Sequence, residues 1–318
     1  MKRANMAFTG IASFGRCPVV QIDEDWQANF AVLGVPYDAG AGYRPGARFG
    51  PRSIRDVSTR FAFFGGTGSS GYWNIGNKKP YLSDVTVVDA GDTDVLYLDV
   101  SHCFESIESS VGGLLKHGAI PVILGGDHSI SYPVVKAFSS LEDVAILHLD
   151  AHLDFRDELL GVRLAHGSPL RRLSELPFVT SAVAIGLRGL RHNLSDYRDA
   201  LDSGVVIVSA TEIHQNGENQ ALGVLERTWE KDRPVYVTID VDFLDPAFAP
   251  GTGTPEPGGF TYQVLMGILE FVTSRFNVVG FDIVEVNPMV DASQITALLA
   301  AQAVIEFMGF IDENRKSQ

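Results

Sequence analysis

The sequence predicts an α/β protein in which one mainly parallel sheet is covered by helices on both faces. From residue 83 onward, apolar and β-branched runs alternate with segments whose apolar residues recur at helical spacing. Strands that alternate with helices form parallel sheets buried on both faces. No linker, composition shift or fixed-period repeat divides the series. The 318 residues are therefore expected to form one large domain.

The residues before this series predict an arm and one further strand. Residues 1–25 have no clear period and are expected to form an N-terminal arm on the body or on a neighbouring subunit, which leaves 26–318 as the single α/β domain. Residues 29–35 are the first buried-strand candidate, and Pro51 suits the first position of a helix. The glycine run at 65–71 follows aromatic residues and opens no helix, so it is interpreted as a surface loop and not as a dinucleotide-binding turn.

The remaining elements follow from the same alternation. Strands are expected at 84–89, 119–124, 144–150, 181–186, 204–208, 234–240 and 277–284. Helices are expected at 101–117, 129–139, 195–203, 218–231 and 261–274. The apolar stretch at 295–311 carries Thr296, Gln302 and Glu306, and its spacing indicates a buried terminal helix and not a membrane span.

Composition argues against several classes of partner. The net charge of -14 disfavours a nucleic-acid surface, which needs clustered Lys and Arg, and is compatible with a cationic substrate. Cys17 and Cys103 are too few for a disulfide framework and lack metal-site spacing, so they are expected to be reduced thiols without an assigned role. Lys2 and Arg3 precede no apolar signal core. A cytoplasmic protein without a membrane partner is expected.

Three segments end in side chains that can bind a metal. Alternate residues of an extended chain face the same way, so Asp150, His152 and Asp154 can converge on one point. In a parallel sheet the ligand site lies beyond the carboxyl ends of the strands. Four carboxylates buried there without cations would be too costly to serve stability. The six candidate ligands are His128, Asp150, His152, Asp154, Asp240 and Asp242.

This ligand set predicts a pair of ions. A carboxylate can bridge two metals, so six residues suffice for a binuclear centre. Carboxylate and imidazole ligands without cysteine favour Mn²⁺, with Zn²⁺, Ni²⁺, Fe²⁺ and Co²⁺ as alternatives. Such a pair lowers the pKa of bound water and supplies hydroxide near neutral pH. Hydroxide attacks electrophilic carbon or phosphorus, so the metals alone do not decide the reaction.

More distant motifs narrow the chemistry. His166 lies twelve residues past Asp154, where it can hand a proton to a leaving group. Residues 245–259 follow the second metal strand as a loop rich in proline and glycine, which is longer than a plain connector needs. Glu285 ends another expected strand, and a carboxylate there can pair with a planar guanidinium.

The motifs together resemble the ureohydrolase signatures of arginase and agmatinase. The matching segments are GGDHS at 125–129, DAHLD at 150–154, HG at 166–167, DVD at 240–242 and DPAFAPGTG at 245–253. The long proline-glycine loop and RPGARFGP at 44–51 are closest to the agmatinase and guanidinobutyrase branch. The resemblance implies a three-layer α/β/α, arginase/deacetylase-like fold with about eight strands and two Mn²⁺ ions per subunit.

The resemblance also implies a role for each site residue. One ion would be held by His128, Asp150, Asp154 and Asp240, and the other by Asp150, His152, Asp240 and Asp242, with Asp150 and Asp240 bridging. The expected reaction is hydrolysis of a guanidino compound to urea and an amine. Glu285 would hold the guanidinium, Asp154 would hydrogen-bond the tetrahedral intermediate, and His166 would shuttle a proton to the departing amine.

The substrate is expected to be agmatine by a small margin, which would place the reaction in polyamine biosynthesis. Arginases carry an Asn- and Thr/Ser-rich loop after the first metal strand, and residues 155–165 depart from that pattern. Asp157 or Glu158 can attract the ammonium of agmatine, whereas Arg156 or Arg163 can bind the carboxylate of a guanidino acid such as 4-guanidinobutyrate or 3-guanidinopropionate. The alternative is that all four are solvated loop charges.

Two other classes of protein compete with this reading. One is a metal-binding but catalytically idle subunit that regulates an oligomer; intact His166 and Glu285 count against it. The other is a deacetylase or phosphoesterase, which the proline-glycine loop and the complete set of six ligands disfavour. Residues 9–14 resemble the arm that agmatinase-like proteins pack between subunits, so a trimer or hexamer is expected.

Overall fold

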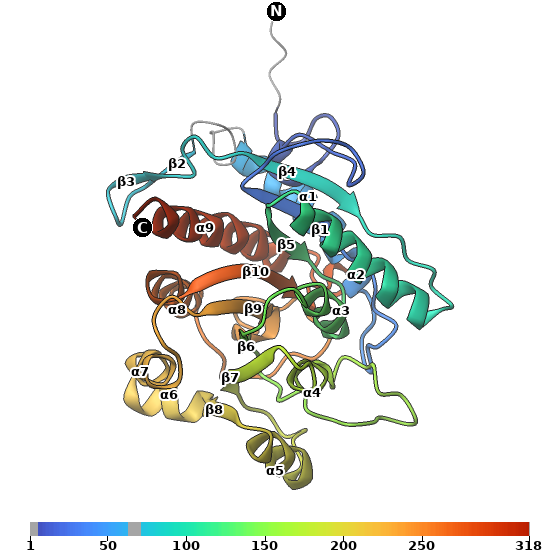
Figure 1. Ribbon diagram of the computed structural model, residues 1–318, viewed down its shortest axis with the longest axis vertical. Coiled ribbons are helices and arrows are strands. Elements are labelled where there is room, and N and C mark those ends of the chain that lie inside the picture. Colours follow the sequence, from blue (N-terminus) through green and yellow to red (C-terminus); the bar gives the residue numbers. More distant parts are fainter. Residues whose placement is uncertain (1–5, 63–70, 318) are drawn as a thin grey trace, which may run out of the picture.

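The structure is a computed structural model that describes residues 6–62 and 71–317. Its centre is a sheet of eight strands in the spatial order β4-β1-β5-β10-β9-β6-β7-β8 (Figure 1). Every neighbouring pair is parallel. The strands are β1 (Phe30–Gly34), β4 (Val87–Asp92), β5 (Ile120–Leu124), β6 (Val144–Leu149), β7 (Val179–Leu187), β8 (Val205–Ser209), β9 (Pro234–Asp240) and β10 (Asn277–Val284). The predicted parallel sheet of about eight strands is confirmed.

Helices cover both faces of this sheet and complete three layers. Within the described residues the α-helices are α1 (Gly50–Ala62), α2 (Val100–Lys116), α3 (Ser131–Lys136), α4 (Pro169–Ser174), α5 (Leu194–Asp202), α6 (Ala210–Asn216), α7 (Asn219–Thr228), α8 (Tyr262–Arg275) and α9 (Ile295–Ser317). Helices α1, α6, α7, α8 and α9 bury one apolar cluster, and α2, α3, α4 and α5 bury the other. Figure 1 shows α8 and α9 on the left of the sheet and α2, α3 and α4 on the right.

The longest of these helices, α9, is a core element. Among the described residues it is long and apolar enough to cross a membrane, yet 72% of its most apolar window is buried inside the protein. It packs against α1 and α8 and covers β10. Packing therefore accounts for its composition, as expected for a buried terminal helix.

The strand order brings distant parts of the chain together. Strands β5 and β6 are consecutive in sequence, but β10 and β9 lie between them in the sheet. The carboxyl ends of β5, β10, β9 and β6 are therefore neighbours. Such a topological switch point is where open parallel sheets bind their ligands.

Several local expectations differ from the structure. The strand expected at 84–89 begins at Val87, because Leu82 and Asp84 have positive φ and hold the preceding chain in a turn. The expected helix at 129–139 is a short 3₁₀ turn, η3 (His128–Ile130), followed by the six-residue α3.

Some short elements had no prediction. The hairpin of β2 (Tyr72–Asn74) and β3 (Lys79–Tyr81) and the helices α4 and α6 are each seven residues or fewer, too short for a clear period. Most of the glycine run at 65–71 lies outside the described residues. In the N-terminal segment, Phe14 is fully buried, and its N–H donates to Asp89 Oδ2 at 2.7 Å.

Candidate metal centre

Four central strand ends position the candidate site. Turn η3 follows β5 and carries His128, Glu285 follows β10, Asp240 ends β9, and Asp150 follows β6. The ends of β5 and β10 are tied directly, because the N–H of Glu285 donates to the Gly126 carbonyl at 2.8 Å. A Cβ at Gly126 would lie 1.8 Å from the Tyr37 carbonyl oxygen, so only glycine fits this turn.

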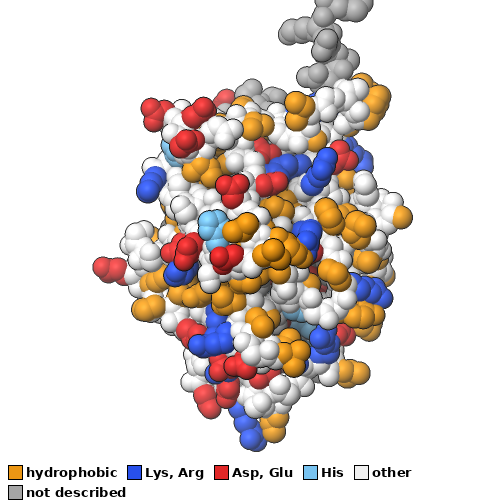
Figure 2. All heavy atoms as spheres, turned by 90° about the vertical axis from the view of Figure 1, so that its right-hand side faces the viewer, with side chains coloured by type: hydrophobic (Ala, Val, Ile, Leu, Met, Phe, Trp, Pro, Cys, Tyr) orange, Lys and Arg blue, Asp and Glu red, His pale blue; other side chains and the backbone are white. Residues whose placement is uncertain are grey.

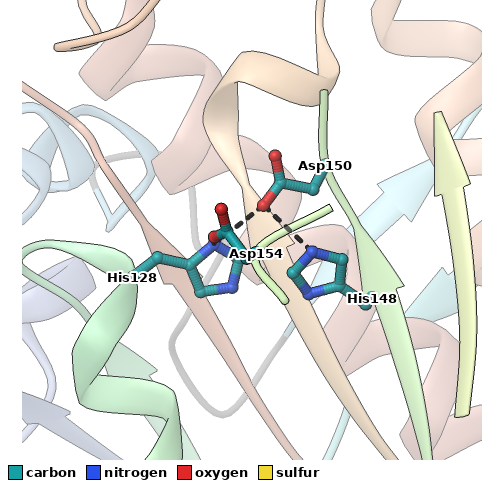
Figure 3. Close-up of side chains that lie close together, drawn as sticks. All are labelled: His128, His148, Asp150 and Asp154. Carbon is teal, nitrogen blue, oxygen red and sulfur yellow. Dashed lines mark ion pairs between the residues drawn. The ribbon is translucent and has the colours of Figure 1, made fainter. Parts of the chain in front are cut away.

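The first group of possible ligands surrounds His128. Its Nδ1 atom lies 2.9 Å from Oδ2 of Asp150, 3.3 Å from Oδ2 of Asp154 and 3.3 Å from Oδ2 of Asp240. Figure 3 shows His128, Asp150 and Asp154 pointing toward one another, with His148 beside them. Asp154 has a φ of 50°, a strained backbone for a residue with a side chain and one typical of functional sites.

The second group shares Asp150 with the first. Nδ1 of His152 lies 3.4 Å from Oδ1 of Asp150 and 3.1 Å from Oδ2 of Asp242. Asp240 lies at the junction, because its Oδ2 faces His128 and its Oδ1 accepts the N–H of Asp242 at 2.8 Å. The six residues predicted as ligands therefore converge on two adjacent points, which is the arrangement that a metal pair needs.

Hydrogen bonds fix His128 as a lone-pair donor. The hydroxyl of Thr238 donates to Oδ1 of Asp282 at 2.6 Å, and Oδ2 of Asp282 accepts from Tyr236 at 2.8 Å. Since the Thr238 proton is used there, Nε2–H of His128 must donate to Thr238 Oγ1, 2.9 Å away. Nδ1, which faces three carboxylates, is therefore the nitrogen of His128 that can offer a lone pair to a cation.

Nδ1 of His128 is one of several buried polar atoms near the site that have no hydrogen-bond partner among the described residues. Nδ1 of His128 and Oδ2 of Asp150 are 2.9 Å apart, yet neither forms a hydrogen bond with correct geometry within the described residues. Nε2 of His152 is buried and unpartnered in the same sense, although Glu256 Oε1 lies 3.6 Å away. The unpartnered nitrogen of His128 beside the unpartnered oxygen of Asp150 fits a bound cation. Nε2 of His152 lies on the other side of its ring from Asp150 and Asp242, which its Nδ1 faces.

The shifted pKa values of the carboxylates indicate how much negative charge the bound ions would have to balance. Burial, followed by repulsion from Asp242 and Asp150, raises the pKa of Asp240 well above its usual value. Burial and Asp150 raise the pKa of Asp154 to about 6. Burial also opposes ionisation of Asp150, but the neighbouring imidazoles outweigh it and hold the pKa of Asp150 well below its usual range. The histidines thus compensate one carboxylate, and divalent cations would compensate the others.

One histidine beside the possible metal ligands was not predicted from the sequence. Nε2 of His148 lies 3.1 Å from Oδ2 of Asp150. It also lies 3.3 Å from the carbonyl oxygen of His152, which can only accept, so Nε2 carries a proton. His148 therefore orients Asp150 and offers no lone pair there. The signal was present, because His148 precedes Asp150 by two residues and shares its face of β6.

Glu285 and His166 form a pair beside the metal groups. Oε1 of Glu285 accepts from the N–H of His128 at 3.0 Å and lies 3.2 Å from Nδ1 of His166. Burial opposes ionisation of Glu285, but hydrogen bonding to His166 outweighs it and lowers the pKa of Glu285. Burial likewise opposes protonation of His166, and Glu285 outweighs it, raising the pKa of His166 to about 9. Glu285, with φ of 62°, is thus held ionised in a strained conformation.

A pocket opens above these groups. Together with its open mouth, it contains about 650 Å³ of space free of protein atoms. Its inner wall includes His152, Asp154, His166, Asp240 and Glu285. Figure 2 faces the right-hand side of Figure 1, and histidine side chains are visible within a hollow in the lower half of that view.

Of the four loop residues predicted as possible substrate selectors, Arg156 lines this pocket and the other three lie elsewhere. Asp157, Glu158 and Arg163 are absent from the described residues that line the pocket. Arg163 instead pairs with Asp157 at 3.1 Å, and Arg172 pairs with the same carboxylate at 2.7 Å. These contacts form an ion-pair cluster on the loop after β6 and on α4, in which Asp157 and Arg163 are exposed and Arg172 is buried. The role of these residues in binding substrate stays a prediction.

Comparison with known proteins agrees with this geometry. The sequence model of the Arginase family matches residues 28–309. Human mitochondrial guanidino acid hydrolase is 37% identical over 302 residues, which cover 94% of this chain and 82% of that protein. Agmatinase of Bacillus subtilis (strain 168) is 36% identical over 298 residues, covering 90% and 94%. The structure of proclavaminate amidinohydrolase from Streptomyces clavuligerus matches with a TM-score of 0.85 at 34% identity, covering 96% and 98%.

The chain belongs to the Arginase family. It is a hydrolase of amidino carbon–nitrogen bonds, and the substrate class is a small guanidino compound. The resemblance to ureohydrolases of the agmatinase and guanidinobutyrase branch is confirmed. The relatives are named after different compounds, so membership of the family identifies the kind of reaction but not the particular substrate.

Proposed function

We propose that the protein hydrolyses a linear guanidino compound with a charged end group to urea and an amine. Agmatine, expected from the sequence, and guanidino acids such as 4-guanidinobutyrate are the two kinds of such substrate. The observation that carries the proposal is the convergence of two carboxylate and imidazole groups on Asp150, directly beside the Glu285–His166 pair. The two carboxylate and imidazole groups supply the metal ligands, and the Glu285–His166 pair supplies a carboxylate and a proton carrier.

The ligand chemistry supports two Mn²⁺ ions, with Ni²⁺, Zn²⁺ or Co²⁺ as alternatives. Four carboxylates and two imidazoles without cysteine suit a hard or borderline cation. His128, Asp150, Asp154 and Asp240 would hold one ion, and Asp150, His152, Asp240 and Asp242 the other. Two divalent ions in these positions would lower the pKa of bound water and supply the nucleophile near neutral pH.

The side chains of this chain bind and orient the substrate. Glu285 is ionised, and its Oε1 atom is engaged by His128 and His166. Its carboxylate binds the guanidinium and holds the central carbon next to the metal ligands, since a planar guanidinium pairs well with a carboxylate. Asp154 lines the same pocket and accepts a hydrogen bond from an N–H or O–H group on the carbon as that carbon becomes tetrahedral.

His166 completes the reaction by moving a proton. Its Nδ1 atom faces Glu285, and its Nε2 atom accepts from the Gly42 N–H at 3.1 Å, so Nε2 must release this contact and take up a proton before it can donate one. As the carbon–nitrogen bond breaks, Nε2 donates to the departing amine nitrogen. Water has then added to the guanidinium carbon, and urea and a protonated amine are released.

A substrate panel tests this proposal. The protein is reconstituted separately with Mn²⁺, Ni²⁺, Zn²⁺ and Co²⁺, and urea is measured with agmatine, 4-guanidinobutyrate, 3-guanidinopropionate, arginine and guanidine. Urea should form from at least one linear guanidine, most rapidly with Mn²⁺. A Glu285→Gln variant serves as the inactive control. If none of the compounds yields urea with any of the metals, the proposal is wrong.

We also propose a trimer or hexamer. The support is the N-terminal segment, where Phe8 and Ile11 are 84% and 91% exposed in the single chain. Large apolar side chains at such exposure are typical of subunit contacts. Light scattering coupled to size-exclusion chromatography should give three or six chains, and a monomer would contradict the proposal.

A further inference from the structure

The pocket above the metal centre has two chemically different ends. Its inner end holds the buried Glu285 and the partly buried His166, which the proposed function assigns to the guanidinium and the leaving amine. Its outer end holds the exposed Arg191 and the partly exposed Arg156 and Asp196. A linear substrate that places its guanidinium at the inner end therefore brings its other end group among these three charges.

The negative charge at the outer end is already compensated. Oδ2 of Asp196 accepts from the side-chain amide of Asn193 at 2.6 Å. The same oxygen lies 3.8 Å from Nε of Arg156. The guanidinium of Arg156 also donates to the carbonyl oxygen of Arg191 at 3.4 Å. Asp196 and Arg156 therefore neutralise each other, and Asp196 is poorly placed to bind a substrate ammonium.

Arg191 is left as an uncompensated cation. Within residues 6–62 and 71–317, its guanidinium has neither a carboxylate within ion-pair distance nor a hydrogen-bond acceptor, although its backbone carbonyl is used by Arg156. An exposed arginine without a partner is unremarkable on an open surface. Here it lines the pocket that leads to the reacting groups.

On the basis of the proposed function, we propose that Arg191, whose backbone carbonyl accepts from Arg156, binds the carboxylate of a guanidino acid and that the enzyme prefers this class to agmatine. Arginine pairs with carboxylates in a bidentate manner, so the site supplies both charge and geometry. The ammonium of agmatine would instead meet an unpaired positive charge. The inner end is balanced for a cation and the outer end for an anion, which together match a zwitterionic substrate.

The central test compares two substrates in an Arg191→Gln variant. We expect the wild-type enzyme to have a higher kcat/KM for 4-guanidinobutyrate than for agmatine. The substitution should lower kcat/KM for 4-guanidinobutyrate by about tenfold or more, mainly through KM, and should leave agmatine unchanged or improved. Arg191→Glu should raise the relative rate with agmatine further. A panel of 3-guanidinopropionate, 4-guanidinobutyrate and 5-guanidinovalerate then measures the length of chain that the pocket accepts.

The matched control is Arg198→Gln. Arg198 is an exposed arginine on α5 that lies outside the pocket lining, so its loss changes the net charge equally and touches no substrate. It should leave both rates within about twofold. A wild-type preference for agmatine, or an equal loss of both activities in Arg191→Gln, would overturn the inference while leaving guanidine hydrolysis intact.

Product binding separates this inference from the proposed function. Calorimetry with 4-aminobutyrate and with putrescine measures recognition of the end group without turnover. The wild-type protein should bind 4-aminobutyrate more tightly, and Arg191→Gln should remove that preference. If no urea forms but this preference is found, the reaction is wrong and the carboxylate site stands. If the wild-type protein binds both products equally, the carboxylate site is wrong.

Discussion

The inner end of the pocket, its floor, and the outer end, its rim, are built in different ways. The floor consists of strand ends, where buried side chains such as Asp150 and Glu285 are fixed by contacts from several elements. The rim consists of the loops after β6 and β7, where Arg191 is exposed and unpaired. Side chains on a rigid sheet can be held for chemistry, whereas loop residues can change the substrate without disturbing it. We therefore expect changes on the floor to abolish the reaction and changes on the rim to alter the choice of substrate.

Removing a charge from the floor should have the largest effect on metal content and on the rate of urea formation. Asp150 belongs to both groups of possible ligands, so Asp150→Asn should release both ions. Urea formation should fall by about a thousandfold or more, since hydroxide supply and substrate position are lost together. Elemental analysis measures the metal and a urea assay measures the rate. Asp157→Asn makes the same chemical change on the exposed loop and should affect neither; comparable losses would erase the distinction between floor and rim.

A second prediction concerns the proton carrier. His166→Asn should lower kcat by about 10²–10⁴-fold while the metal content stays the same. In the metal-free protein, nuclear magnetic resonance should find the pKa of His166 near 9, raised by Glu285, and Glu285→Gln should lower it. Because the folded-state value lies above the usual 6.5, this pair stabilises the fold fully below about pH 6.5 and loses that effect as the pH rises through 9. An unchanged value in Glu285→Gln would contradict the pairing.

A third prediction tests the hydrogen bonds behind the floor. Thr238→Val removes the hydroxyl that accepts from His128 and donates to Asp282. Metal affinity should weaken by about 10–100-fold because the tautomer of His128 is no longer fixed. The metal-free protein should lose about 1–3 kcal/mol of unfolding free energy from the buried groups left unpaired. Metal titration and denaturant unfolding measure the two effects. Thr238→Ser keeps the hydroxyl and should restore the affinity; failure to do so would point to packing as the cause.

The smallest expected effect is at Arg163. Its exposed pairs with Asp157 and Glu175 should contribute little to stability, because solvent screens the charges. Arg163→Gln should change turnover of agmatine and of 4-guanidinobutyrate by less than about twofold, because the side chain does not line the pocket. Steady-state kinetics with both substrates measures this. A selective loss of guanidino-acid turnover would instead support Arg163 as the selector and weaken the case for Arg191.

The floor could be predicted from the sequence because regular strands fix the direction of their side chains. Alternation along β6 puts His148 on the side from which Asp150 follows, and this rule would have found His148. His152 and Asp154 lie past the end of β6, and the loop there, in which Asp154 has a positive φ, turns them toward the same centre. Helix α6 was not predicted, although Ser209 and Glu212 have the spacing of a capping box and could have indicated its start. These are local signals that survive folding.

The rim could not be predicted because loop geometry depends on distant contacts. The sequence offered Asp157 and Arg163 either as substrate selectors or as solvated loop charges, and only the fold shows that they pair with each other and that Asp157 also pairs with α4. Arg191 lies beyond a different strand, β7, and only the sheet order brings its loop over the pocket. The insertion of β9 and β10 between β5 and β6 is likewise a long-range property that no local pattern encodes.

The most direct test of the central claim is the metal content of the purified protein after equilibration with Mn²⁺ and removal of free metal. Elemental analysis of the wild-type protein should give about two ions per chain, and His128→Ala and His152→Ala should each lower that number. A stoichiometry of one ion or none in a folded wild-type protein would contradict a binuclear centre that shares Asp150.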